Sequence, residues 1–342
     1  MVTRRATLTG FALLLAVLMA AAGAKAILYD TLDPDLFWRL RVADQLHDQS
    51  FPAPIIDHLS FASSKEPWTP YSWLADLAIK RLWDFGGYRT AIAAEALMTA
   101  DLVLFIGLTA LEISITHHGR PRYLAAALAA FTGEFLSLAY LSFRPVTFAL
   151  VLLAAIAWLL QRDQRLGGRS RAVWWIIPLT ALLANVHLYV VFAPLAVAAV
   201  FLGEICRSAA YGSGTNVKRW AVPTRRDSIL LAATSLASLA TPMLPGALAA
   251  AWHYQFHDPM VSGNTIAEMQ PFYRGQLGSI SAILVAIVIL AALINRRRLT
   301  AGNWLLLGIS LLALLRLGRF APIFAIFAVP TLAATLPQLS DV

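Results

Sequence analysis

The sequence predicts an all-α protein, a polytopic membrane bundle of about ten helical spans, and three observations lead to this prediction. Of the 342 residues, 59% are hydrophobic and only 13% are charged, with a mean hydropathy of +0.67. A soluble domain carries roughly 25% charged residues. The apolar residues form long blocks, and the basic residues gather in the short loops between them. We therefore expect one continuous membrane domain over residues 1–342, although the length alone would suit about two soluble domains.

Ten apolar blocks approach the roughly 20 residues that a helix needs to cross a bilayer. They are 8–28, 90–113, 123–141, 145–160, 173–186, 188–205, 228–251, 276–294, 301–315 and 320–337. The first block could instead be a cleaved signal peptide, because Ala22-Gly23-Ala24 resembles a cleavage site. The stretch 173–205 is interrupted at Asn185 and His187. It predicts either two short spans or a re-entrant hairpin, a feature that often marks a binding site in membrane proteins.

The basic residues predict the orientation of the bundle. With the N-terminus inside and ten crossings, every basic cluster between spans falls in the cytoplasm, as the positive-inside rule requires. The clusters are Arg120 and Arg122; Arg162, Arg165, Arg169 and Arg171; Arg207, Lys218, Arg219, Arg225 and Arg226; and Arg296, Arg297 and Arg298. This pattern explains the net charge of +8 without nucleic-acid binding. The single cysteine, Cys206, excludes an internal disulfide and a cysteine-based metal site.

The longest segment between predicted spans, residues 29–87, is then the first extracytoplasmic loop. It contains a predicted amphipathic helix, 71–85, that would lie in the membrane interface. Thr69 suits the N-cap and Pro70 the first helical position, while Gly86-Gly87 would end the helix. Charged residues spaced four apart on this helix are expected to pair with one another: Asp76, Lys80 and Asp84.

Two carboxylates just after the first span are the first candidate site residues. Pro34 keeps Asp33 out of the helical region, so Asp33 and Asp35 come from an extended stretch. Such a pair can share a divalent cation, or one member can act as a general base. Alternatively, Asp33 caps a short helix over 35–47. Arg39 could pair with Asp35 one turn further along.

Arginines near the predicted outer ends of later spans are the second group of candidates. Arg144 precedes Pro145 at the start of a span, and Arg316 and Arg319 lie three apart on one predicted helix face. An arginine beside a span is costly unless it reaches lipid headgroups or meets an anion, and its planar fork suits phosphate. Headgroup contact and phosphate binding both remain open from the sequence.

Four further polar residues fall on the same predicted side of the membrane. Asp57 and His58 lie in a loop rich in turn formers, where they suit either a turn or a binding role. His187 sits at the interruption of 173–205, as a hydrogen-bonded core residue or as a ligand. Glu268 lies in a polar loop, as a solvated carboxylate or as a site residue.

A set of short motifs, taken in order, resembles a bacterial group of multispan proteins within the GT-C glycosyltransferase-like superfamily, and it covers nearly the whole chain. The motifs are Asp33-Pro34-Asp35-Leu36-Phe37-Trp38, Asp57-His58-Leu59-Ser60-Phe61, Trp68-Thr69-Pro70-Tyr71-Ser72-Trp73-Leu74, Arg144-Pro145, Ala184-Asn185-Val186-His187, Thr241-Pro242, Glu268-Met269-Gln270-Pro271 and Arg319-Phe320-Ala321-Pro322. The chain departs from that pattern with Arg39 where relatives often have His, with Met243-Leu244 in place of Tyr-Gly, and with Met269 in place of Trp.

The resemblance implies a glycosyltransferase of the bacterial cytoplasmic (inner) membrane, active on the extracytoplasmic face. Its donor would be a sugar on a polyprenyl-phosphate or polyprenyl-diphosphate carrier, and its acceptor a glycan, a lipid or a protein. Asp33 or Asp35 would be the base or would bind a divalent cation such as Mg²⁺ or Mn²⁺, and Arg316 or Arg319 would contact the lipid phosphate. His187 and Glu268 would line the sugar or acceptor pocket.

A non-enzymatic role is the alternative: a transporter of a lipid-linked glycan, or a membrane subunit in the assembly of envelope polysaccharide. Charged residues and short spans serve transport as well as catalysis. A transferase should bring Asp33 or Asp35 close to Arg319 at one face of the membrane. A transporter should instead show a polar path through the middle of the bundle.

Overall fold

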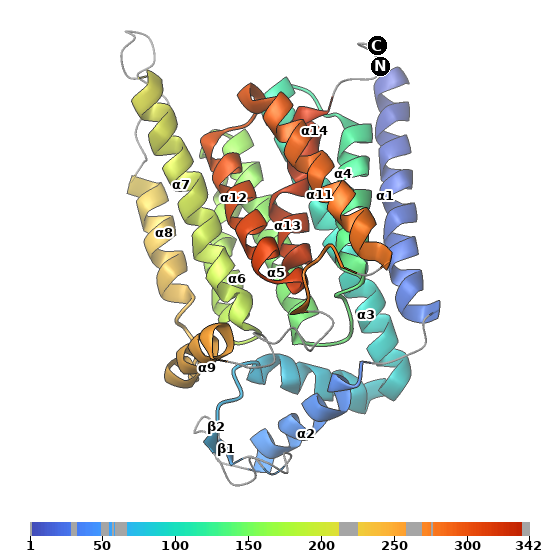
Figure 1. Ribbon diagram of the computed structural model, residues 1–342, viewed down its shortest axis with the longest axis vertical. Helices are drawn as coiled ribbons and strands as arrows, with labels where there is room; N and C mark the ends of the chain where they lie inside the picture. Colours follow the sequence, from blue (N-terminus) through green and yellow to red (C-terminus); the bar gives the residue numbers. More distant parts are fainter. Residues whose placement is uncertain are drawn as a thin grey trace.

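The computed structural model describes residues 2–28, 33–48, 55–56, 58, 67–211, 225–257, 269–274 and 276–336. In this part of the chain nearly all residues are helical, which confirms the prediction of an all-α protein. Strands occur there only as a minimal antiparallel pair, β1 (Ile55–Ile56) and β2 (Pro67–Trp68), in which Ile55 lies opposite Trp68. The long helices stand side by side in one bundle (Figure 1).

The bundle helices run roughly parallel to the long axis of the molecule, and the start of α1 and the end of α14 lie at the same end (Figure 1). These helices are α1 (Val2–Leu28), α3 (Trp73–His118), α4 (Tyr123–Leu138), α5 (Pro145–Arg165), α6 (Ile176–Ala184), α7 (Phe192–Tyr211), α8 (Arg225–Ala237), α11 (Gln276–Ile294), α12 (Ala301–Arg316), α13 (Ala321–Phe327) and α14 (Leu332–Thr335). Helices α2 (Asp35–Asp48) and α9 (Leu244–Phe256) lie at the opposite end, together with the two strands. Short 3-10 turns connect several helices: η1 (Arg171–Trp175), η2 (Leu188–Val191), η4 (Arg296–Arg298), η5 (Gly318–Phe320) and η6 (Val329–Thr331).

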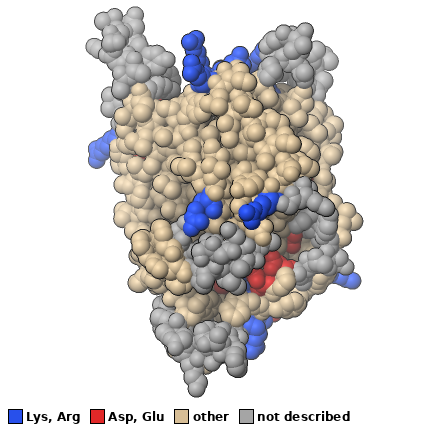
Figure 2. All heavy atoms as spheres, in the orientation of Figure 1, with Lys and Arg blue, Asp and Glu red and all other residues tan. Residues whose placement is uncertain are grey.

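Small side chains allow the central helices to approach one another closely. Ala126 and Ala130 of α4 have no exposed surface, and Gly133 packs directly against Ile106 of α3. Phe324 of α13 is fully buried in the same core. Large apolar side chains point outward instead, among them Val17, Leu97, Leu236, Leu312 and Phe131. The part of the visible face between the basic residues at its top and two basic patches near its middle carries few charged residues (Figure 2), as expected for a surface in contact with lipid.

The lengths and apolar composition of the helices support the prediction of a membrane protein. In the described part of the chain, four are long and apolar enough to cross a bilayer: Trp73–His118, Pro145–Arg165, Leu188–Cys206 and Gly318–Thr335. Shorter apolar helices cover Leu8–Ala24, Tyr123–Leu138, Arg171–Ala184, Gly278–Ile294 and Ala301–Arg316. The total of about ten crossings, and the direction in which the bundle faces, therefore remain predictions. The predicted block 228–251 is not one helix, because α8 ends at Ala237 and α9 begins at Leu244.

Helix α3 changes direction at a pair of glycines. Gly86 and Gly87 leave the helical conformation, and Gly87 has a φ of 57°, which favours glycine. The first part of α3 therefore lies across the lower end of the bundle, while the second part runs along the bundle (Figure 1). Gly86-Gly87, predicted to end the helix, thus forms a kink, and α3 continues beyond it. The predicted start is wrong: Ser72 takes the N-cap position, because Thr69 and Pro70 form a turn whose carbonyls accept from Tyr71 and Trp73.

Candidate functional site

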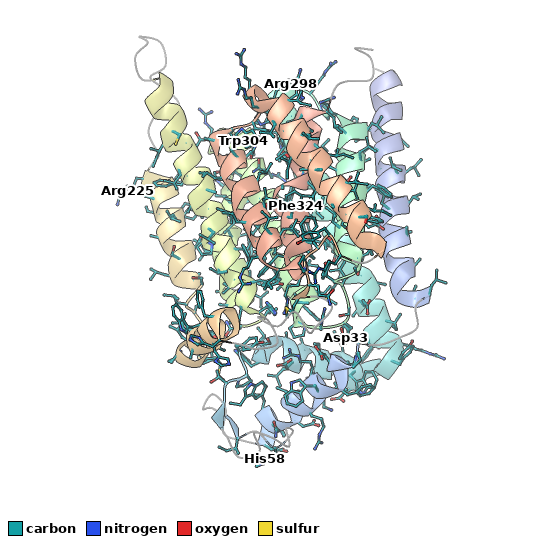
Figure 3. The ribbon with its side chains drawn as sticks, in the orientation of Figure 1. Asp33, His58, Arg225, Arg298, Trp304 and Phe324 are labelled. Atoms are coloured by element: carbon teal, nitrogen blue, oxygen red, sulfur yellow. The ribbon has the colours of Figure 1, made fainter. Side chains whose placement is uncertain are left out.

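Asp33, Asp35 and Arg144 meet at the end of the bundle that carries α2. Asp33 caps α2, because its Oδ1 accepts a hydrogen bond from the N–H of Asp35 at 2.9 Å. Its Oδ2 accepts from Ser142 Oγ at 2.6 Å and lies 3.6 Å from Arg144 Nε. Arg144 Nη1 lies 3.8 Å from Asp35 Oδ2. The predicted cap is therefore confirmed, and Asp33, labelled in Figure 3, also belongs to a polar cluster with Ser142 and Arg144; its role as a base stays a prediction.

A hydrogen-bonded turn before α5 presents Arg144 to these carboxylates. Arg144 is extended, with φ −148° and ψ 165°, as the position before proline favours. The carbonyl of Ser142 accepts from the N–H of Arg144 at 2.8 Å and from Thr147 Oγ1 at 2.6 Å. The N–H of Thr147 donates to the carbonyl of Arg144 at 3.0 Å. These local bonds fix the backbone from which the Arg144 side chain projects.

The break between α6 and α7 is held in place by Asn185. Its Oδ1 accepts from Trp73 Nε1 at 2.9 Å, and its Nδ2 donates to the carbonyls of Ala181 and Ala240, both at 2.8 Å. The carbonyl of Asn185 also accepts from the N–H of Leu74. Asn185 thus joins the break to the start of α3 and to the segment after α8. This network fixes the position of the neighbouring His187.

His187 presents a ring N–H at the centre of the site. Its Nδ1 accepts from the N–H of Tyr189 at 3.2 Å, so in the neutral ring Nε2 carries the proton. The ring lies edge to face with Tyr189 and Tyr71. His187 keeps some exposed surface but is closely surrounded by other residues. A neutral imidazole here can donate a hydrogen bond to a ligand.

Three arginines from separate segments lie within electrostatic range of His187. They are Arg319 of η5, Arg39 of α2 and Arg144 before α5. Burial first, and then these three positive charges, hold the pKa of His187 well below its ordinary value of 6.5. His187 therefore stays neutral at physiological pH, and the positive charge at this point of the molecule comes from the guanidinium groups.

Arg316 and Arg319 do not share a helix face, contrary to the prediction. Helix α12 ends at Arg316, and Leu317 is extended, with φ −148° and ψ 133°. The physical reason lies in the next residue: the N–H of Gly318 donates to the carbonyl of Gln270, and the two backbones approach so closely that a side chain at 318 would clash. Arg316 is consequently exposed, whereas Arg319 turns inward and its Nη1 lies 3.8 Å from Met269 Sδ.

The sequence did not reveal the pairing between Arg39 and Asp76. The predicted partner of Arg39 was Asp35, but Arg39 Nη1 lies 3.5 Å from Asp76 Oδ1. Asp76 was expected to pair with Lys80, yet the Asp76 side chain has 0% exposure and lies beside Arg39. The other expected pair, Lys80 with Asp84, is confirmed, and Lys80 also contacts Asp44. The spacing contained a signal that Asp76 would be buried. Asp76 lies three residues before the buried Ile79, and residues three apart share one face of a helix.

Three other residues were predicted to belong to the site. Asp57 and Glu268 lie outside the described residues. His58 is exposed and lies well below Asp33, at the tip of the molecule (Figure 3). The histidine that belongs to the site is therefore His187.

A divalent cation does not suit the Asp33 and Asp35 pair as the structure arranges it. Asp33 has both oxygens engaged, and Arg144 lies close to one oxygen of each carboxylate. Among the described residues, no group of three or more His, Cys, Asp or Glu side chains could hold a metal ion. Arg144 places positive charge beside both carboxylates, and the use of Mg²⁺ or Mn²⁺ stays a prediction.

Comparison with known proteins finds no matching family model, no matching curated protein and no matching solved structure. The resemblance to the GT-C superfamily therefore remains a prediction from short motifs. Any function has to be argued from the geometry of the site.

His187 predicts a specific pH dependence of stability. In the unfolded chain the ring takes up a proton below its ordinary pKa of about 6.5, whereas in the folded protein its pKa is held lower. The unfolded state then binds more protons, so the free energy of unfolding falls as the pH drops below about 6.5, by at most about 1.4 kcal/mol per pH unit. Thermal unfolding of the protein in nanodiscs between about pH 7.5 and pH 5 measures this.

The control separates His187 from the other titrating groups. His187→Asn keeps an acceptor near the N–H of Tyr189. Because it cannot take up the proton, the fall in the free energy of unfolding below about pH 6.5 should become smaller. His58→Asn, at an exposed histidine, should leave the pH dependence of the free energy of unfolding unchanged. An unaltered slope in His187→Asn would show that other residues cause the acid sensitivity.

Proposed function

We propose that this protein is a membrane transferase that binds a lipid-linked sugar phosphate at the α2 end of the bundle and transfers the sugar to an acceptor hydroxyl. One observation carries the proposal. Arg39, Arg144 and Arg319, from three separate segments, all act electrostatically on one neutral histidine, and Arg144 also lies beside the two carboxylates Asp33 and Asp35. This arrangement supplies positive charge, a hydrogen-bond donor and a candidate base at one place.

The arginines and His187 suit a phosphate at the membrane surface. Guanidinium groups bind phosphate oxygens with paired N–H donors, and the Nε2–H of His187 adds a neutral donor. The prenyl tail of a lipid-linked sugar would lie against the apolar surface of the bundle, where large side chains point outward. Its phosphate would then sit at the level of the arginines. In the visible face, acidic residues gather in one patch near the lower end, with two basic patches above it (Figure 2).

Asp35 is the better of the two carboxylates for general-base catalysis. Its side chain is 57% exposed, whereas that of Asp33 is 15% exposed and already accepts two hydrogen bonds. Asp35 would take the proton of the acceptor hydroxyl, whose oxygen forms a bond to the anomeric carbon of the sugar. The bond between that carbon and the phosphate oxygen breaks, and the phosphate leaves with the electron pair. The arginines stabilise the negative charge that develops on the phosphate.

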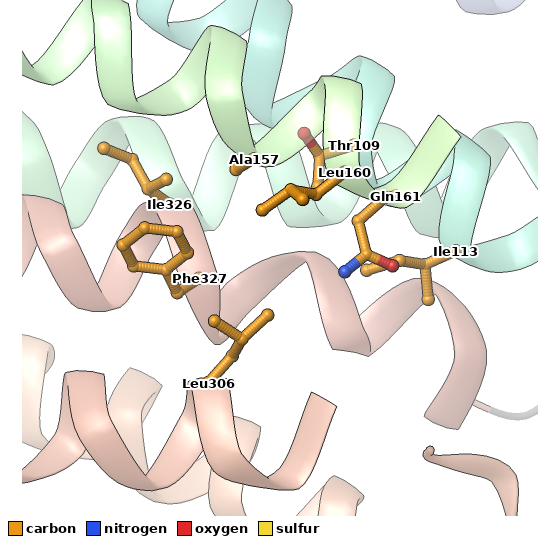
Figure 4. A pocket seen from close by; sticks show the side chains of 8 residues that line it. All are labelled: Thr109, Ile113, Ala157, Leu160, Gln161, Leu306, Ile326 and Phe327. Atoms are coloured by element: carbon orange, nitrogen blue, oxygen red, sulfur yellow. The ribbon is translucent and has the colours of Figure 1, made fainter. Parts of the chain in front are cut away.

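Two buried carboxylates inside the bundle favour transport as a second candidate function. Glu95 of α3 and Glu134 of α4 are both buried, and ionisable groups at membrane depth often belong to a path for ions or substrates. A cavity between α3, α5, α12 and α13 does not continue such a path (Figure 4), because its volume of about 10 Å³ holds about one water molecule. It is lined by Thr109, Ile113, Ala157, Leu160, Gln161, Leu306, Ile326 and Phe327.

Mass spectrometry of lipid-linked glycans distinguishes the two functions. Deletion of the encoding gene in the native cell should remove a sugar from a product and should make its lipid-linked donor accumulate. Re-expression of the intact chain should restore the product. A donor and product that are unchanged in amount would exclude the transferase. A glycan that is intact but retained on the wrong face of the membrane would support transport.

A further inference from the structure

The pair formed by Arg39 and Asp76 links α2 to the first part of α3. Arg39 Nη1 lies 3.5 Å from Asp76 Oδ1, with side-chain exposures of 17% for Arg39 and 0% for Asp76. The surroundings are apolar, since Leu36 of α2 and Ile79 of α3 are fully buried in one cluster at this contact. An ion pair is therefore enclosed in the interface between two helices that apolar side chains already hold together.

Stability alone does not account for this pair. A buried ion pair can usually be replaced by apolar side chains of similar volume without loss of stability. Here the pair also leaves two atoms unsatisfied, because in the described structure neither Asp76 Oδ2 nor Arg39 Nε has a hydrogen-bond partner. Enclosed polar atoms without partners destabilise a fold. The pair therefore lowers the stability of the fold. Its role is to be sought in the position that it gives to the Arg39 side chain.

The position of Arg39 relative to His187 indicates that role. Arg39 is one of the three arginines within electrostatic range of His187, and it comes from a different helix than Arg144 and Arg319. A free arginine side chain samples many rotamers, and ordering it on binding would weaken affinity. A carboxylate fixed on α3 limits this freedom. We propose that Asp76 is a positioning residue that holds the Arg39 guanidinium toward His187, so that Arg39 helps bind the phosphate of a lipid carrier.

This assignment rests on the proposed function. It predicts whether Asp76→Asn strengthens or weakens binding of the phosphate lipid, and the direction of that change tests it. The comparison is made at pH 8, where the Asp76 carboxyl is largely ionised although burial raises its pKa to about 7, and its negative charge alone repels a phosphate. If Asp76 acted only through that charge, Asp76→Asn would strengthen phosphate binding. If Asp76 acts by positioning Arg39, the same substitution weakens binding, because the charge-assisted contact that orders the guanidinium is lost.

The test measures binding of undecaprenyl phosphate to the full chain in nanodiscs, with undecaprenol as the lipid that lacks phosphate. We expect Asp76→Asn to bind undecaprenyl phosphate about tenfold more weakly than the unaltered protein, which corresponds to one charge-assisted hydrogen bond. Asp76→Glu keeps the charge but displaces the guanidinium, so it should also weaken binding. Lys80→Gln is the matched control on the next turn of α3, since Lys80 pairs only with the partly exposed Asp44 and Asp84 among the described residues, and it should bind normally.

A double-mutant cycle separates positioning from a general loss of structure. Arg39→Ala should weaken binding, and adding Asp76→Asn to Arg39→Ala should cause no further loss. Melting temperatures of all variants are measured in parallel, and if Asp76→Asn does not fold, Asp76→Glu decides the question by itself.

Three results would overturn the assignment. The first is binding by Asp76→Asn, or by a folded Asp76→Glu, that is as tight as in the unaltered protein or tighter. The second is a loss from Asp76→Asn that persists in the Arg39→Ala background. In both cases the proposed function stands as long as the unaltered protein binds the phosphate lipid. The third is an unaltered protein that binds undecaprenyl phosphate no better than undecaprenol, which removes the proposed donor and this assignment together.

Discussion

Asp35→Asn is expected to abolish sugar transfer while the protein remains folded. The substitution removes the carboxylate that would accept the proton of the acceptor hydroxyl, and loss of a general base typically slows a reaction by about 100-fold or more. The effect on stability should be small, because the Asp35 side chain is 57% exposed and its contact with Arg144 Nη1 is long, at 3.8 Å. Mass spectrometry of the glycan product, after complementation of the deletion strain, measures the transfer.

Asp44 of α2 serves as the control for this prediction, and Asp33, which precedes α2, serves as a comparison. Asp44 is partly exposed, at 39%, and pairs with Lys80 and Arg41, so Asp44→Asn should keep full activity. Asp33→Asn retains a side-chain oxygen for the helix cap but loses the charge that faces Arg144, so it should lower both stability and transfer. Unchanged transfer by a well-folded Asp35→Asn would remove that residue from the mechanism.

The parts of the fold that follow from local pattern were predictable from the sequence. Long apolar blocks indicated helices in a membrane, and the described chain is helical with several apolar helices. Gly86-Gly87 and the interruption at Asn185 marked real breaks, because both signals depend on a few neighbouring residues. The placement of Asp33, Asp35 and Arg144 at one end of the bundle also followed from the sequence, through the distribution of basic loops, while the side of the membrane stays a prediction.

The contacts within the site were not predictable, because they depend on tertiary packing. Arg39 had a local candidate partner in Asp35, but α2 packs so that Asp76 is the carboxylate within reach. Local spacing also placed Arg316 and Arg319 on one helix face. The docking of Gly318 onto the backbone of Gln270 breaks that helix and separates the two side chains. The sequence gives no sign of the docking at Gly318, and for Asp76 it shows only that this residue shares a helix face with Ile79, without naming Arg39 as the partner.

Arg144→Ala is expected to have the largest effect on stability. The Arg144 and Asp33 side chains are each 15% exposed, and their contact joins the start of α2 to the start of α5. Without Arg144, the largely buried Asp33 charge keeps, among the described residues, the Ser142 hydroxyl and the helix N–H as partners. Breaking such a pair from one side costs about 3 kcal/mol. We expect a lower melting temperature in nanodiscs, together with loss of phosphate-lipid binding and transfer. Arg144→Lys should be intermediate, because lysine keeps the charge without the paired donors.

A second substitution shows how much of this loss comes from the isolated charge of Asp33. Adding Asp33→Asn to Arg144→Ala removes the unpaired carboxylate while keeping a side-chain oxygen for the cap. If the isolated charge causes the destabilisation, the double variant melts at a higher temperature than Arg144→Ala alone. Binding of the phosphate lipid should not recover, because the guanidinium is still missing. A double variant that is no more stable than Arg144→Ala would mean that Arg144 acts through packing of its side chain and not through its charge. Recovery of lipid binding would mean that the phosphate is bound elsewhere.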